Sequence, residues 1–130
     1  MNEKDELDEI FVDKNEPADK KILVEILKPF VTIDSEGVIS FSTEYNKLKE
    51  SKKVLVYLLC KKAMCLKGIK DIIEPSKESE VIGKAMVSKS TSKNALYTLY
   101  KNLVKKDKDG YIIPNYNLLK TKTLLLEKSE

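Results

Sequence analysis

The sequence predicts one small α+β domain that is mostly helical, and three observations lead to this prediction. Apolar residues recur at helical spacing along most of the chain. Two alternating segments are each interrupted by a charged turn that ends in glycine, as in β-hairpins. Between residues 75 and 114, two short amphipathic segments are joined by a tight turn and followed by one of these hairpins. A chain of 130 residues with 42% hydrophobic residues is long enough for one hydrophobic core.

The basic residues argue against several classes of function. All 24 of them are lysine, because the sequence contains neither arginine nor histidine. Lysine carries a point charge suited to phosphate, but it lacks the planar fork with which arginine reads guanine. Histidine is the commonest general base and metal ligand. Because nucleotide-binding and nucleophile motifs are also missing from the sequence, we predict no enzymatic activity, no cofactor and no metal site.

The charges are distributed unevenly along the chain. Residues 1–19 contain eight acids and two lysines, a net charge of −6, whereas residues 20–130 contain 22 lysines and 13 acids, a net charge of +9. A basic body favours nucleic acid as a partner. We expect residues 1–17 to form a disordered acidic leader, because acid-rich termini seldom pack. This leader could shield the basic body, bind a partner, or only keep the chain in solution.

Residues 18–50 are predicted to form a helix and a β-hairpin that precede the rest of the fold. Apolar residues at helical spacing continue up to Pro29, which predicts a helix over 18–28. Two short alternating segments then flank a turn, Asp34–Gly37. Thr43 is expected to cap a short helix after this hairpin.

The strongest apolar run of the chain begins at Val54 and continues, with two lysines in it, to Gly68. A run of this length predicts a central core helix of about 16 residues rather than a buried strand, with Ser51 as its N-cap. Cys60 and Cys65 match neither a redox motif nor zinc-ligand spacing. We therefore expect both to be reduced and buried.

Two short helices joined by a tight turn are predicted after Pro75, which opens the first helix. Ser88 or Ser90 is expected to cap the second helix, which the apolar spacing extends over 89–105. A charged hairpin follows, with its turn at Asp107–Gly110. The inward-facing residues are expected to be Val81, Ile82 and Ala85 in the first helix, and Ala95, Leu96, Leu99 and Leu103 in the second.

The leucine-rich segment 117–130 is predicted to form a C-terminal helix or tail. If it is helical, it is amphipathic and could either pack on the body or pair with a second copy of the chain. We expect it to pack on the body of the same molecule.

Residues 85–96 read AMVSKSTSKNAL and lead into leucine-spaced residues, then into NLVKKD and DGY. This pattern resembles the turn, recognition helix and wing of winged helix-turn-helix transcriptional regulators of the archaeal type. The resemblance covers 54–116 and implies a winged-helix domain, which we place at 51–116. Two positions depart from the family pattern, because Met86 stands in place of the turn glycine and Ser92 in place of a core valine. Ser92 could face the groove if the helix is rotated.

The resemblance implies a DNA-binding face on helix 89–105 and on the hairpin that follows it. The N-terminal residues of a recognition helix reach base edges in the major groove, and wing residues reach phosphate or the minor groove. The expected base contacts are Lys89, Ser90, Lys93 and Asn94. The expected contacts to phosphate, ribose or the minor groove are Thr91, Tyr97, Lys101, Lys105, Lys106 and Lys108.

We therefore predict a cytoplasmic transcriptional regulator that binds double-stranded DNA. A homodimer would form through the C-terminal tail or the N-terminal extension. No segment is apolar enough to suggest a membrane span, and the acidic N-terminus does not fit a signal peptide. The alternative is a protein-interaction module in which the winged helix and the C-terminal tail dock a partner protein. The modest net charge of +3 and the lack of arginine favour that alternative.

Overall fold

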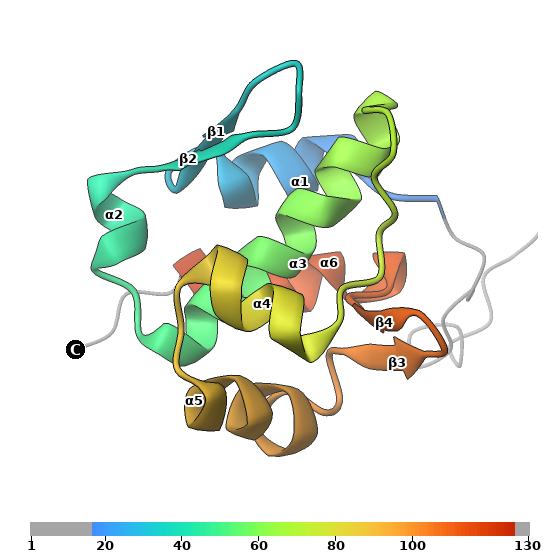
Figure 1. Cartoon of the computed structure of the whole chain (residues 1–130). Helices are drawn as coiled ribbons and strands as arrows, with labels where there is room; N and C mark the ends of the chain where they lie inside the picture. The colour runs from blue at the N-terminus through green and yellow to red at the C-terminus, as the bar shows by residue number, and fades with distance from the viewer. Residues whose placement is uncertain (1–16, 127–130) are drawn as a thin grey trace, which may run out of the picture.

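A long central helix, α3, organises the fold of this protein, which is known from a computed structural model (Figure 1). The structure describes residues 17–126, so the predicted acidic leader lies outside the described residues except for Pro17. The described chain is of the α+β class and mostly helical, with two separate antiparallel hairpins. Its elements are α1 (Lys20–Leu27), β1 (Val31–Ile33), β2 (Ile39–Phe41), α2 (Thr43–Asn46), α3 (Glu50–Lys67), α4 (Glu78–Ala85), α5 (Lys89–Asn94), the π-helical turn η2 (Ala95–Leu99), β3 (Lys105–Asp107), β4 (Gly110–Ile112), the 3-10 turn η3 (Asn115–Asn117) and α6 (Leu118–Leu126).

Helix α3 is the predicted core helix, and its side chains are buried without a break from Val54 to Lys62. It is surrounded by α1, α4, α5 and β4. The helix ends where predicted, at Gly68, which has a left-handed φ of 82° that glycine adopts without a steric penalty. The prediction of Ser51 as N-cap is wrong, because the helix begins one residue earlier, at Glu50.

The N-terminal extension has the predicted helix and hairpin. The Asp19 carboxylate caps α1 by accepting the Ile22 N–H at 3.1 Å. In the first hairpin, the Asp34 carboxylate accepts the N–H groups of Glu36 and Val38 at 2.8 and 3.0 Å. These two bonds close the predicted turn from within, because both partners lie within four residues of Asp34.

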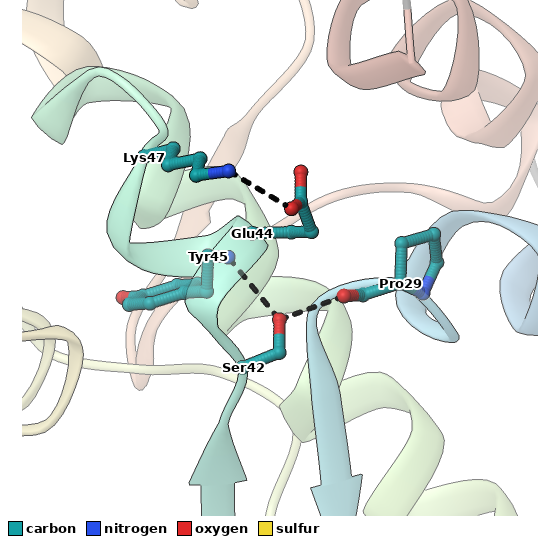
Figure 2. Close-up of polar contacts among 5 residues, drawn as sticks. All are labelled: Pro29, Ser42, Glu44, Tyr45 and Lys47. Atoms are coloured by element: carbon teal, nitrogen blue, oxygen red, sulfur yellow. Dashed lines mark hydrogen bonds and ion pairs between the residues drawn. The ribbon is translucent and has the colours of Figure 1, made fainter.

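The short helix α2 is capped by Ser42 and not by Thr43, as Figure 2 shows. The Ser42 hydroxyl accepts the Tyr45 N–H at 3.2 Å and donates to the Pro29 carbonyl at 2.7 Å. A single hydroxyl therefore ties the start of α2 to the chain that leaves α1. The cap lies one residue before the predicted one because only Ser42 reaches both partners.

Helix α6 packs against α1 of the same molecule, as expected for the leucine-rich C-terminal segment. It buries Leu118, Thr121 and Leu125, and an ion pair joins Lys122 to Glu25 of α1. The buried apolar residues from α1 to α6 form one contiguous cluster. None of the described helices is long and apolar enough to cross a membrane.

Helix α4 begins at Glu78, three residues after the predicted opening at Pro75. The reason is a tertiary contact, because Ser76 pairs with Tyr111 of β4 instead of entering the helix. The Ser76 N–H donates to the Tyr111 carbonyl at 3.0 Å, and the Tyr111 N–H donates back at 2.8 Å. Ser76 thus adds a short third strand segment to the β3–β4 hairpin.

The turn between α4 and α5 is tight. Met86 adopts a left-handed conformation with a φ of 62° and a ψ of 51°, which is the conformation that a glycine at this position would supply. The Val87 N–H donates to the Ile82 carbonyl at 3.3 Å across this turn. Ser88 then caps α5, as one of the two predicted candidates. The turn is therefore as compact with methionine as with glycine.

The prediction of one helix over 89–105 is wrong. Helix α5 gives way at Ala95 to a π-helical turn, which closes when the Tyr100 N–H donates to the Ala95 carbonyl at 2.9 Å. A π turn holds one residue more than an α turn, so later side chains are rotated by about 100°. Leu99, predicted to be inward, is consequently 53% exposed, and Tyr100 is buried in its place. Lys101 follows the helix instead of lying on it.

Candidate nucleic-acid interface

The predicted contact residues lie on α5, on the chain after it and on the β3–β4 hairpin. In Figure 1 these elements occupy the lower side of the molecule, whereas α1 and the β1–β2 hairpin occupy the upper side. All six predicted lysines are exposed, and within residues 17–126 none of them forms an ion pair. Their charges are therefore available to an external anion. These six are Lys89, Lys93, Lys101, Lys105, Lys106 and Lys108.

A hydroxyl network holds the first turn of α5. The Ser88 hydroxyl accepts the Thr91 N–H at 3.2 Å and donates to the Thr91 hydroxyl at 2.8 Å. The Ser90 hydroxyl lies 3.4 Å from that of Ser88. The Ser88 N–H donates to the Glu50 carboxylate of α3 at 3.1 Å. This network fixes the start of α5 against the start of α3, and Thr91 is part of it as well as a predicted contact.

Three predicted residues meet in a shallow hollow between α5 and the start of α3. Its volume is about 410 Å³, and Ser90, Thr91 and Asn94 line it. Its other walls are Leu99 and three residues that the sequence interpretation missed, Lys49, Glu50 and Ser51. No local pattern could have found those three, because they join the site only through the contact between α3 and α5.

Tyr97 is half-exposed, and it is engaged with neighbours inside the protein. Its hydroxyl donates a hydrogen bond to the Glu78 carboxylate of α4, and its ring lies 6.1 Å from the Tyr111 ring between centroids. The bond to Glu78, followed by one to Tyr111, raises the pKa of Tyr97 well above its usual range. The Tyr97 hydroxyl therefore donates its hydrogen bond to Glu78 and not to a phosphate in this structure.

Ser92 does not face outward, so the alternative in which a rotated helix turns Ser92 toward the DNA groove is wrong. Ser92 is fully buried beside the inward-facing Ala95 and Leu96. Its hydroxyl has no hydrogen-bond partner among the described residues. It occupies the place of a core residue.

The β3–β4 hairpin is built by local hydrogen bonds. The Asp107 carboxylate accepts the N–H groups of Asp109 and Gly110 at 2.7 and 3.1 Å, which closes the turn that presents Lys108. All three residues of β3 are exposed, including Lys106. The turn also depends on a close approach, because a Cβ on Gly110 would lie 2.5 Å from the Ser76 backbone.

Aromatic rings support the two lysines of β3. The Lys106 ammonium lies 5.6 Å from the centroid of the Tyr111 ring, and the Lys105 ammonium lies 5.6 Å from that of Tyr116. Such contacts restrict a lysine without neutralising it. The two charges are therefore held on the β3–β4 hairpin and stay available to an anion.

No protein-family model, curated protein or solved structure significantly matches this chain. The geometry therefore carries the functional argument. It combines a shallow hollow between α5 and the start of α3, exposed lysines on α5 and after it, and exposed lysines on the β3–β4 hairpin. This set of groups can bind a polyanion, and Ser90 and Asn94 add donors and acceptors for base edges.

Proposed function

We propose that this protein binds double-stranded DNA as a winged-helix protein. Helix α5 would enter the major groove with its N-terminal end, and the β3–β4 hairpin would follow the backbone as the wing. The observation that carries the proposal is the set of six exposed lysines without ion-pair partners in the described part of the chain. The order of elements also supports it, since α3, the Ser76 segment, α4, α5 and the hairpin follow one another as in winged helices.

The chemistry of the face fits backbone-dominated binding with limited base reading. Asn94 is exposed and could make a bidentate contact with adenine, and Ser90 could bond several base edges. The lysines would neutralise phosphates, each contributing about 0.9 to the salt slope. Glu50 and Glu78 lie beside this face, but each accepts a hydrogen bond from Ser88 or Tyr97. Because the lysines would neutralise phosphates, binding should be strongly salt-dependent.

We further propose that the protein is a cytoplasmic transcriptional regulator that acts as a dimer. Leu119 of α6 is 60% exposed and Leu126 is 38% exposed, although α6 packs on α1. These leucines could form the contact between two copies. A dimer would place two α5 helices on two half-sites of one DNA duplex.

The proposal is tested by fluorescence anisotropy with labelled duplex DNA between about 50 and 200 mM salt, where phosphate contacts lose affinity steeply. Lys89→Glu and Lys93→Glu should each weaken binding, while the circular dichroism spectrum stays unchanged. Lys28→Glu is the matched control, because it makes the same charge change at the C-cap of α1, and α1 lies on the opposite side of the molecule from α5 in Figure 1. Equal affinities for all four proteins, or no binding at low salt, would contradict the proposal.

A second candidate function is a protein-interaction module. Met86 in the turn before α5 is 59% exposed, and Leu99 at the end of η2 is 53% exposed. Exposed apolar side chains at this surface favour a protein partner over a phosphate backbone. A stoichiometric partner that is retained after nuclease treatment and lost in Met86→Ser and Leu99→Ser would support this function. A pulldown that nuclease abolishes would count against it.

A further inference from the structure

A separate pocket lies between the β1–β2 hairpin and helices α3 and α4. Its volume is about 320 Å³, near the lower end of the range of about 300–1,000 Å³ for small-molecule sites. Its apolar walls come mainly from the hairpin and α3. They include Val38, Ile39, Phe41, Met64 and Ile72. None of the proposed DNA-contacting residues lines it.

Three buried or partly buried polar groups meet in this pocket. Tyr57 is 3% exposed and Lys61 is 5% exposed, and both bond the same carboxylate oxygen of Glu80. The distance from the Lys61 ammonium to that oxygen is 2.5 Å. Glu80 belongs to the first turn of α4, so this cluster links α3 to the start of α4. Polar groups that converge in an otherwise apolar pocket are the usual pattern of a ligand site.

The charges of the pocket favour an anion. Its charged lining groups are Lys61, Lys84 and Glu80, which leaves one net positive charge. Lys84 is exposed and forms no ion pair within residues 17–126. An ammonium group has three N–H donors, so Lys61 keeps donors beyond the one that it gives to Glu80. Burial also raises the pKa of Tyr57 well above its usual range, so the phenol stays neutral with its one O–H donated to Glu80 and adds no negative charge to the pocket.

We propose that this pocket binds a small organic anion with an apolar body. The head group would lie between Lys84 and Lys61, and the body would lie against Ile39, Phe41 and Met64. The alkyl or aryl part would replace water along the apolar walls, which is the main source of affinity in such sites. This site does not depend on whether the chain binds DNA.

The experiment uses three probes that share one tail: octanoate, octanol and octylammonium. Amide shifts in two-dimensional NMR spectra of the full chain are followed during titration with each probe. The proposal expects octanoate to bind most tightly and to shift amides of 37–41, 61–64 and 80–84. Equal affinity for the three probes would overturn it, because only the tail would then matter. Shifts confined to other regions, or no shifts, would also overturn it.

Two sets of variants test the head-group contact. Lys84→Gln should weaken octanoate binding by about 1.4-fold to fivefold, the range for an exposed charge pair. Lys77→Gln, an exposed lysine just before α4 that does not line the pocket, should leave the affinity unchanged. Val38 is 58% exposed at the pocket wall, so either a negative or a positive side chain can replace it there without burying a charge. Val38→Asp should weaken octanoate binding and Val38→Lys should strengthen it. An octanoate affinity that none of these changes alters would overturn the proposed anion site.

Discussion

The Tyr45 hydroxyl donates a hydrogen bond of 2.7 Å to the main-chain carbonyl of Ala85, the last residue of α4. Tyr45 is fully buried, and its ring stacks on Phe41 of β2 with 4.0 Å between centroids. The N-terminal extension therefore holds the end of α4 immediately before the turn that leads into α5. The orientation of the candidate interface therefore depends in part on residues that precede α3.

Removal of the Tyr45 hydroxyl should lower the stability of the fold. Tyr45→Phe keeps the ring and its stacking but leaves the buried Ala85 carbonyl without this donor, so we expect a loss of about 1–3 kcal/mol in the free energy of unfolding. Urea denaturation measures this change. Tyr116→Phe is the control, because the Tyr116 hydroxyl makes no hydrogen bond within the described residues. Equal stability of the Tyr45→Phe protein and the wild type would show that the bond contributes nothing net.

The left-handed Met86 should be replaceable by glycine with a gain in stability. A residue with a side chain costs about 1–2 kcal/mol in this conformation, and the exposed Met86 side chain gives little packing in return. We expect Met86→Gly to raise the free energy of unfolding by about 1 kcal/mol. The converse change, Gly83→Ala inside α4, should also stabilise by about 1 kcal/mol, since a Cβ there meets no atom within 4 Å. Loss of stability in Met86→Gly would argue against the left-handed turn.

Ser92→Ala should stabilise the fold without changing DNA affinity. The substitution removes a buried hydroxyl that has no partner among the described residues, and alanine favours the helix more than serine does. We expect a gain of about 1 kcal/mol in thermal or urea denaturation. Ser79→Ala on the exposed side of α4 is the control and should change stability by less than about 0.5 kcal/mol. A large drop in DNA affinity for Ser92→Ala would mean that Ser92 reaches the groove.

The two thiols should differ in reactivity and one of them should contribute to alkaline sensitivity. Burial raises the pKa of the fully buried Cys60 to about 12, whereas Cys65 is only half-buried. Alkylation followed by mass spectrometry should therefore modify Cys65 first. Because the folded state keeps the Cys60 proton where the unfolded state loses it, the stability from Cys60 is complete below pH 9 and falls as the pH rises toward 12.

The comparison for this pH effect is Cys60→Ala. Its free energy of unfolding should fall less steeply above pH 9 than that of the wild type, because the buried thiol is gone while the tyrosines remain. Parallel pH profiles for the two proteins would contradict the assignment. Rapid alkylation of Cys60 in the folded protein would contradict its burial.

Several elements were predictable from short stretches of sequence because their causes are local. The turns at Asp34–Gly37 and Asp107–Gly110 close because one aspartate carboxylate in each accepts hydrogen bonds from N–H groups at most four residues away. The end of α3 at Gly68 and the Ser88 cap of α5 are equally local. The exposure of the interface lysines also followed from the sequence, since charged side chains rarely enter a core unpaired.

Other features were decided only by the tertiary structure. The bridge between Ser76 and Tyr111 delays the start of α4, and the π turn at Ala95 exchanges the roles of Leu99 and Tyr100. Neither has a signal in the local sequence, because the first needs a partner far along the chain and the second shifts the helical period by one residue.

The sequence by itself determined the helices, the hairpins and the uneven distribution of charge, through periodicity, turn residues and caps that act over a few positions. Only the tertiary structure decided that Lys61 is buried against Glu80, that Tyr45 bonds Ala85 and that the start of α3 joins the candidate interface. These contacts join residues 19 and 40 positions apart, or separate helices. They form because packing of the whole core brings the groups together, which no short stretch of sequence encodes.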